Sequence, residues 1–295
     1  MDEVGTRILS DWHCHLGEGC TYDPATDTAW WFDILERTLF EADLASGVVV
    51  SHALPLMASV LAFLDDDSQL LATENGLYVR DIADGRLVLH TPLEADNAAT
   101  RSNDGRVHPC GALWIGTMGR NAEKDAGAIY HFDRGGLRRL YAGITIPNAI
   151  CFSPDGATAY FTDSSAGILY RVAIDPATAL PAGDPVPLFD NRGGVGGLDG
   201  AIVDSEGLIW NARWGGSCVD VYTPEGDRVR TLRVPAKQPS CPVFVGRNFD
   251  QLLVTTAWEG MDEHARAADP HHGKTFILDV GARGRPEPRI RLGPA

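Results

Sequence analysis

The sequence has no segment that would place the chain in a membrane. No apolar run approaches the roughly 18 residues that a spanning helix needs. The first residues, Met1 to Gly5, include neither a basic stretch nor an apolar one, so we expect no signal peptide. These absences predict a cytoplasmic chain with no membrane partner.

Basic residues are also scarce. Lys and Arg together number 25 against 40 Asp and Glu, which gives a formal net charge of −15. Nucleic acids and anionic membranes select surfaces rich in Lys and Arg, so we expect neither as a partner. The charge does not argue against a small substrate, because a local basic spot can lie within an acidic surface.

Two common chemical motifs are missing as well. No Gly-x-Ser-x-Gly elbow occurs, so serine-based hydrolysis has no support. The cysteines are scattered without a Cys-x-x-Cys pair, and in a cytoplasmic chain of this size we expect buried thiols. They are Cys14, Cys20, Cys110, Cys151, Cys218 and Cys241.

What the sequence does contain is a repeat with a period of roughly 40–50 residues. Each unit has a tight turn rich in Pro, Asp, Asn and Gly, followed by an apolar strand rich in β-branched and aromatic residues. Residues 153–156 and 160–162 form one such pair, and residues 204–207 and 210–212 form another. Six units of about four strands predict an all-β fold, a six-bladed β-propeller with four antiparallel strands per blade.

The repeat also assigns the ends of the chain. Residues 7–10 precede the first unit, and we expect this N-terminal strand to close the last blade, which removes an exposed edge. Residues 289–292 are expected to be the fourth strand of the last unit. Residues 33–46 have local helix propensity, but the repeat predicts a strand there. No linker interrupts the chain, so we expect residues 1–295 to form a single domain.

A polar residue recurs six positions before each turn residue. In a propeller the first strand of every blade lines the central channel, so equivalent residues are expected to form a ring around the axis. A buried carboxylate there is costly unless it is paired or bound to metal. The six residues are Glu18, Ser59, Asn103, Asn148, Asp199 and Ser240.

Two carboxylates and two amide oxygens form a hard-oxygen donor set. Such a set suits Ca²⁺, Mg²⁺ or Mn²⁺, and Zn²⁺ through its carboxylates. The alternative is a channel filled by hydrogen-bonded polar side chains and ordered water. Arg101 lies two residues before Asn103, on the same face of an extended strand. Its guanidinium either binds substrate oxygens by two parallel bonds or pairs with an Asp at the surface.

Four ordered motifs resemble the SMP-30/regucalcin/gluconolactonase family, and together they span all six repeats. The later Trp214-Gly215-Gly216 resembles the bacterial sugar-lactonase branch of that family. The four motifs are Leu16-Gly17-Glu18-Gly19, Arg101-Ser102-Asn103-Asp104-Gly105 with Gly116-Thr117-Met118, Asn148 before residues 152–156, and Asp199-Gly200 before residues 204–210.

The resemblance implies a six-bladed propeller that hydrolyses an aldonic or aldaric acid lactone at one divalent cation. Ca²⁺ is the first choice, with Zn²⁺, Mn²⁺ and Mg²⁺ as the others. The implied ligands are Glu18, Asn148 and Asp199, and Asp199 is also the implied general base or proton shuttle. The expected partner is a small sugar lactone, and the expected assembly is a monomer or a weak homodimer.

The resemblance also assigns substrate contacts. Arg101 and Asn103 are implied to hold the sugar hydroxyls. Asn121 falls where the family often has Glu, which indicates a different sugar or stereochemistry. Three further departures are Cys20 after Gly19, Ala149 after Asn148 and Leu198 before Asp199, where Pro, Gly and Pro respectively are usual.

Two rival interpretations remain. One is a non-catalytic Ca²⁺-binding propeller of the regucalcin kind. The other starts from Asp11-x-His13-x-His15, which resembles the first metal strand of the amidohydrolase barrels. A barrel needs eight alternating helices, whereas this chain shows strands at hairpin spacing. His13 and His15 are therefore expected to be scaffold or channel-mouth residues.

Overall fold

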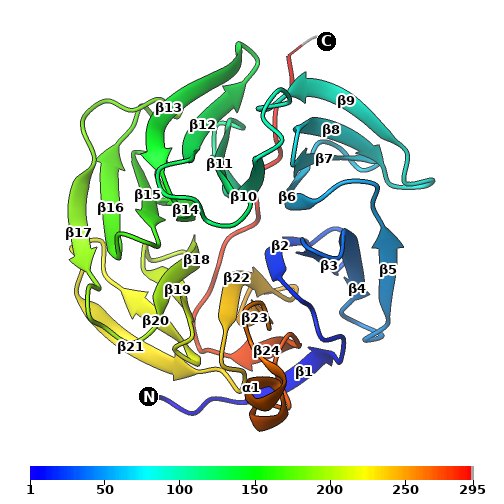
Figure 1. The fold of residues 1–295 in the computed structure, drawn as a ribbon, viewed down its shortest axis with the longest axis vertical. Coiled ribbons are helices and arrows are strands. Elements are labelled where there is room, and N and C mark those ends of the chain that lie inside the picture. Colours follow the sequence, from blue (N-terminus) through cyan, green and yellow to red (C-terminus); the bar gives the residue numbers. More distant parts are fainter. Residues whose placement is uncertain (294–295) are drawn as a thin grey trace. The chain divides into compact units, whose positions relative to one another are not determined.

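The computed structural model describes residues 1–293 and contains six four-stranded antiparallel sheets. They are the blades of a six-bladed β-propeller, as the repeat predicts (Figure 1). Within these residues, the helix α1 (Glu263–Ala268) lies in the connection between β23 (Gln251–Thr256) and β24 (Thr275–Asp279). No helix among residues 1–293 has both the length and the apolar character that a membrane crossing requires.

The chain divides into two compact units, and unit 1 comprises residues 1–55 and 191–286. It contains three sheets, each written here in the order of hydrogen bonding. They are β2 (Gly17–Asp23), β3 (Thr28–Asp33), β4 (Thr38–Asp43), β5 (Val49–Ala53); β18 (Gly197–Val203), β19 (Ile209–Trp214), β20 (Cys218–Tyr222), β21 (Arg228–Arg233); and β22 (Pro239–Val245), β23 (Gln251–Thr256), β24 (Thr275–Asp279), β1 (Thr6–Ser10).

Unit 2 comprises residues 56–190 and the segment that begins at Glu287. It holds the other three sheets. They are β6 (Ala58–Phe63), β7 (Ser68–Thr73), β8 (Gly76–Asp81), β9 (Leu87–Pro92); β10 (Thr100–Val107), β11 (Leu113–Gly119), β12 (Gly127–Asp133), β13 (Gly136–Ile144); and β14 (Pro147–Phe152), β15 (Thr158–Asp163), β16 (Ile168–Ala173), β17 (Val186–Asp190).

The N-terminal strand closes the last blade, as predicted. β1 pairs antiparallel with β24, with Thr6 opposite Leu278 and Ile8 opposite Phe276. The prediction of a strand at residues 289–292 is wrong. That segment has no strand structure, and Ile290 N–H donates to Phe63 O in unit 2 at 2.9 Å. The outer place in the last blade is taken by β1, and prolines at 286 and 288 lack the N–H that a ladder requires.

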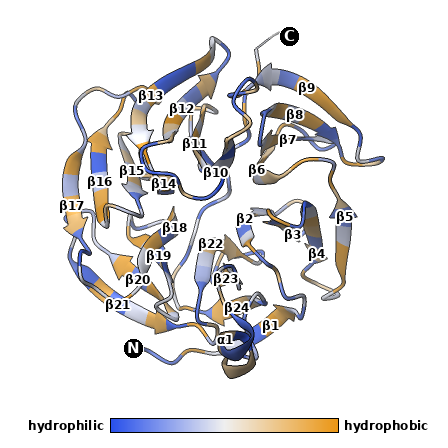
Figure 2. Ribbon diagram, in the orientation of Figure 1, coloured by the Kyte–Doolittle hydropathy of each residue, from blue (hydrophilic) through white to orange (hydrophobic). Residues whose placement is uncertain are grey.

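The helix propensity of residues 33–46 does not decide their structure. Residues 38–43 form β4, which pairs with β3 on one side and β5 on the other, so the strand predicted from the repeat is confirmed. Outer strands alternate in character, as β21 (Arg-Val-Arg-Thr-Leu-Arg) does in Figure 2. Burial of one strand face therefore outweighs local propensity here.

A β-bulge interrupts the first strand of every sheet. In four of the sheets, the register with the second strand shifts at residues 18–21, 58–60, 102–105 and 148–151. In the other two it shifts between Leu198 and Ala201 and between Pro239 and Pro242. Bulges twist a strand and redirect a side chain. The six polar positions predicted from the repeat all fall at these bulges.

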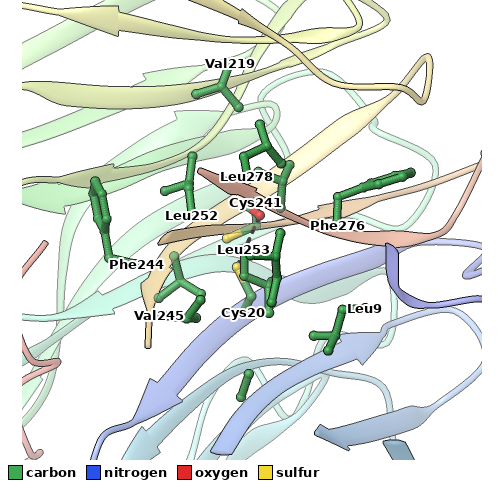
Figure 3. Close-up of a cluster of buried hydrophobic side chains, with 14 of the residues drawn as sticks. Leu9, Cys20, Val219, Cys241, Phe244, Val245, Leu252, Leu253, Phe276 and Leu278 are labelled. Atoms are coloured by element: carbon green, nitrogen blue, oxygen red, sulfur yellow. Dashed lines mark hydrogen bonds between the residues drawn. The ribbon is translucent and has the colours of Figure 1, made fainter. Parts of the chain in front are cut away.

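The core of unit 1 joins its last blade to the neighbouring strands. Figure 3 shows Leu9 of β1, Cys20 of β2 and Phe276 of β24 around Leu253 of β23. The Cys20 thiol donates to Cys241 O at 3.2 Å. All six cysteines are free thiols and all but Cys110 are buried, as expected from the sequence.

Candidate active site at the bulges of the first strands

All six polar bulge residues are buried. None exposes more than the 8% of Asn103. Buried polar groups are costly without partners, so each one needs a hydrogen bond, an ion pair or a bound ion. The others are Glu18, Ser59, Asn148, Asp199 and Ser240.

In unit 2 the predicted residues form one hydrogen-bonded chain. Arg101 Nη1 donates to Asn103 Oδ1 at 2.8 Å. Asn103 Nδ2 donates to Asn148 Oδ1 at 3.1 Å, and Asn148 Nδ2 donates to Ser164 Oγ at 3.0 Å. The structure therefore brings Arg101, Asn103 and Asn148 together on β10 and β14, which pack against each other. This series of hydrogen bonds also fixes the orientation of the amide groups of Asn103 and Asn148.

Asp104 supports this arrangement, a role that its place in the motif Arg101-Ser102-Asn103-Asp104-Gly105 does not reveal. Its Oδ2 accepts a hydrogen bond from Ile150 N–H at 2.7 Å, which ties β10 to the bulge of β14. Burial raises the pKa of the Asp104 carboxyl, and the nearby Arg106 opposes that rise. The adjacent Ala149 takes a positive φ of 56°, as Gly19 does (58°) after Glu18. The predicted ligand residue thus precedes a left-handed residue in both blades.

In unit 1 the strands of Glu18 and Asp199 both pack against β22. Ser240 of β22 donates its hydroxyl to Gly17 O, the residue before Glu18. On the other side, a Cβ added at Gly200 would lie 2.7 Å from Ser240 O. Glu18 Oε2 accepts from Gly19 N–H at 2.9 Å. Ser240 is therefore a spacer between the two strands that carry the predicted carboxylates.

A glycine-rich segment, Gly193-Gly194-Val195-Gly196-Gly197, comes shortly before Asp199 in the chain. The buried Arg213 of β19 binds it, because its guanidinium donates to Val195 O at 2.7 Å and to Gly196 O at 3.2 Å. The same guanidinium also contacts Asn191 and pairs with Asp220 at 3.3 Å. The base of this loop is thus anchored, and Arg213 gave no sequence signal beyond its place in a strand.

Asn121 is not part of the hydrogen-bonded chain of unit 2. It lies exposed in the connection between β11 and β12, and its Nδ2 donates to Glu123 Oε1 at 2.8 Å. Its backbone N–H donates to Glu123 Oε2 at 3.0 Å. The side-chain bond from Asn121 is the largest cause that lowers the pKa of Glu123. A carboxylate therefore stands beside the position where the family often has Glu.

His13 and His15 take part in packing within unit 1. The His15 ring stacks on Trp258 at 3.8 Å between ring centroids, and its Nδ1 lies 3.1 Å from Glu36 Oε1. His13 Nδ1 donates to His272 O at 2.7 Å. Across residues 1–293, no three His, Cys, Asp or Glu side chains are grouped to hold a metal ion. The scaffold interpretation of both histidines agrees with these contacts.

The donor chemistry of the predicted ligands fits a hard divalent cation. Glu18 and Asp199 supply carboxylates, and each is 5% exposed. Asn148 Oδ1 has a fixed direction, and its hydrogen bond from Asn103 uses one of two lone pairs. Carboxylate and amide oxygens are the donors that Ca²⁺ and Mg²⁺ prefer.

Comparisons with known proteins agree on one family. The family model for the SMP-30/gluconolactonase/LRE-like region matches residues 16–258. A Rhizobium meliloti (strain 1021) protein, named a candidate sugar lactone lactonase, is 59% identical over 97% of this chain and 97% of its own. A Haloferax volcanii pentonolactonase is 34% identical over 98% of this chain and 99% of its own.

A solved structure agrees in fold as well as in sequence. It is described as a calcium-binding protein, regucalcin, from Agrobacterium tumefaciens. It is 51% identical, and it matches with a TM-score of 0.97 over 98% of each chain. The family match contains every residue predicted for the site, from Glu18 to Asp199. The chain belongs to the SMP-30/gluconolactonase/LRE-like family.

Proposed function

We propose that this protein hydrolyses a sugar lactone, of the aldonic or aldaric acid class, to the open-chain acid in a reaction that depends on a divalent cation. The observation that carries the proposal is the buried chain from Arg101 through Asn103 to Asn148. This chain joins the Arg101 guanidinium, which can bind hydroxyl oxygens, to the Asn148 amide oxygen, which suits a metal ion. Two relatives of near-full-length match are named as lactonases, which supports the reaction class.

The proposed cation ligands are Glu18, Asn148 and Asp199. Ca²⁺ is the first choice, because the donors are all hard oxygens and a 51% identical structure is described as calcium-binding. Zn²⁺, Mn²⁺ and Mg²⁺ are the alternatives to test. Three protein ligands leave positions open for water and substrate, as catalytic sites require.

The protein's own residues then perform the proton transfer. When bound, the cation supplies Lewis-acid chemistry that polarises the lactone carbonyl and lowers the pKa of water. Asp199 accepts the proton of the attacking water, and the C–O bond to the ring oxygen breaks. Asp199 returns the proton to that oxygen, so it ends unchanged; such a base contributes about 10²–10⁴-fold. Arg101 and Asn103 hold the sugar hydroxyls and orient the ring.

A panel of aldonolactones and aldarolactones, read by a pH indicator, tests the proposal. We expect acid release that stops on chelation and returns with Ca²⁺, Mn²⁺, Mg²⁺ or Zn²⁺. Asp199→Asn should lower kcat by about 10²-fold or more. Asp84→Asn is the matched control, since Asp84 lies in a turn of unit 2, where it accepts from Arg86 N–H. If no lactone is hydrolysed with any of the four metals, the proposal that the protein is a lactonase is wrong.

The second candidate function is a non-catalytic Ca²⁺-binding propeller. The description of the Agrobacterium tumefaciens structure as a calcium-binding regucalcin favours it. It predicts tight Ca²⁺ binding by calorimetry without turnover of any lactone. The lactonase proposal predicts both, so the two measurements on one sample separate the candidates.

We also propose a location, a domain organisation, partners and an assembly state for the protein. We place the protein in the cytoplasm as a single domain, with a small molecule as its substrate and without a nucleic acid or membrane partner. The net charge of −15 and six free thiols support this location and these exclusions. A monomer or weak homodimer is expected, and light scattering over a concentration series tests it.

A further inference from the structure

A buried asparagine of β19 binds the backbone at Asp199. Asn211 has no exposed surface, and its Nδ2 donates to Asp199 O at 2.6 Å and to Gly200 O at 3.2 Å. Carbonyl oxygens only accept hydrogen bonds, so both contacts require the amide nitrogen to face the bulge. The orientation of the Asn211 side chain is thereby fixed by the two residues of the bulge.

The other five blades carry no amide side chain at this position. Asn211 pairs with Ala201, the first residue after the bulge. The residues opposite the corresponding position elsewhere are apolar or aromatic: Trp30, Ala72, Ile115, Tyr160 and Val254. Asn is a poor strand former, and packing against a neighbouring blade favours an apolar side chain. Asn211, the exception, lies in the blade that carries Asp199.

Asn211 has a cost in folding stability that its packing does not explain. Its Oδ1 is buried and accepts no hydrogen bond within the described residues. A buried acceptor without a donor destabilises a fold. A residue that costs stability and contacts a proposed active-site residue is better explained by that contact.

We propose that Asn211 is a positioning residue that sets the direction of the Asp199 carboxylate. The backbone at Asp199 and Gly200 is held from two sides. Asn211 binds the carbonyl oxygens of both residues on one side, and β22 approaches Gly200 on the other, where an added Cβ would lie 2.7 Å from Ser240 O. With the peptide fixed, the carboxylate has little freedom beyond its own rotamers. This inference rests on the proposed role of Asp199 as ligand and base.

Two substitutions remove the amide donor while keeping the side chain near its original size. Asn211→Leu replaces it with an apolar group, and Asn211→Asp places carboxylate oxygens against two carbonyls. We expect Ca²⁺ affinity, measured by calorimetry, to weaken about 10- to 100-fold, as for other residues that orient metal ligands. At saturating Ca²⁺ we expect kcat to fall by about tenfold or more, with KM little changed because Arg101 and Asn103 belong to unit 2.

Val254→Ala is the matched control. Val254 is fully buried and holds the same register position in β23, opposite the bulge at Ser240. It should lower the midpoint of thermal unfolding and leave Ca²⁺ affinity and kcat per folded molecule unchanged. Asn211→Ser keeps one hydroxyl donor and should lie between wild type and Asn211→Leu. It also provides a folded variant if the larger changes prevent folding.

The outcomes separate this inference from the lactonase proposal. Asn211 variants that match Val254→Ala in Ca²⁺ affinity and in kcat show a purely structural residue and overturn the inference. Absence of Ca²⁺ binding by the wild-type protein also overturns it. If the wild type binds Ca²⁺ but hydrolyses no lactone, the lactonase proposal fails, and weaker Ca²⁺ binding by the Asn211 variants still supports the positioning role.

Discussion

Arg101, a proposed substrate contact, also makes hydrogen bonds within the fold. Its Nη1 donates to Ser102 O at 2.9 Å and to Asn103 Oδ1 at 2.8 Å. Lysine keeps the charge but lacks the planar fork that holds two acceptors at once. We therefore expect Arg101→Lys to raise KM for the lactone by about tenfold with a smaller effect on kcat.

Arg138→Lys is the control for that prediction, because Arg138 is exposed in β13 of the same unit. Initial-rate kinetics at saturating metal provide the measurement. An unchanged KM in Arg101→Lys would mean that the guanidinium supports Asn103 without contacting substrate.

Contacts with Glu123 determine which hydrogen-bonding groups of Asn121 are available to a ligand. Both the backbone N–H and the amide of Asn121 are bonded to its ionised carboxylate. If this loop faces the substrate, its negative charge disfavours lactones that carry a second carboxylate. We expect Glu123→Gln to raise kcat/KM for aldarolactones over neutral aldonolactones by about threefold. Glu225→Gln, an exposed change in unit 1, should leave the ratio unaltered.

That ratio should also be sensitive to salt, because an exposed charge is screened. The increase in Glu123→Gln should shrink as ionic strength rises. A ratio equal to the wild-type value at low salt would place Asn121 outside the substrate contacts and remove it from the proposed site.

At the scale of an element, the regular position of the bulges allowed the candidate site residues to be predicted from the sequence. A six-residue offset from each turn locates the polar residue because turn, strand and bulge keep one spacing in every blade. The pattern therefore predicted the strands, the closing role of β1 and the burial of Glu18 and Asp199. It placed Arg101 on the same strand face as Asn103, and in the structure Arg101 Nη1 donates to Asn103 Oδ1.

Other residues could not be found that way. Asn211 and Arg213 act across strands, and a repeat of local spacing carries no information on which acceptor a buried donor meets. Residues 289–292 have a strand-like composition, but the outer place in the last blade was already filled by β1. Competition between two segments for one edge depends on tertiary structure, which single-segment patterns do not record.

Gly200 tests whether the close approach of β18 and β22 matters. A Cβ there would meet Ser240 O at 2.7 Å and Cys241 Cα at 3.0 Å, and both are backbone atoms that cannot move alone. We expect Gly200→Ala to cost about 1–3 kcal/mol of unfolding free energy. Calorimetry should show a midpoint lower by several degrees. Gly183→Ala meets no atom within 4 Å and should be neutral; equal midpoints for both variants would contradict the close approach.

His108 links two turns of unit 2 and makes its stability depend on pH. Its Nε2–H donates to Gly156 O at 2.9 Å, and Nδ1 accepts from Cys110 N–H at 3.0 Å, so the neutral ring satisfies both contacts. Burial lowers the pKa of His108. The unfolded chain then binds more protons below pH of about 6.5, and stability falls as pH drops from that value through the folded pKa.

The measurement is the difference between wild type and His108→Gln. Buried carboxyls such as Asp33, whose pKa is raised by burial, act in the opposite direction at lower pH and cancel in that difference. We expect wild type to lose its advantage between pH 7 and 5 in thermal unfolding. A constant difference over this interval would show that His108 is not titrating there.

At the scale of the whole molecule, the proposed ligands come from distant parts of the sequence. They are Glu18, Asn148 and Asp199. A cation bound only by the folded chain stabilises it by mass action. Removing any one of the three should then abolish the same stabilisation, even though the residues are far apart in sequence.

Chelation measures that stabilisation directly. At a Ca²⁺ concentration of about 100 times the dissociation constant, linkage adds about 2.7 kcal/mol to the unfolding free energy. For a chain of this size we expect the unfolding midpoint to rise by about 5–10 °C over the chelated protein. Glu18→Gln and Asn148→Ala should each lose most of the rise, whereas Asp84→Asn should keep it. A rise that survives both substitutions would mean that Ca²⁺ binds elsewhere, and the ligand assignment would have to be abandoned.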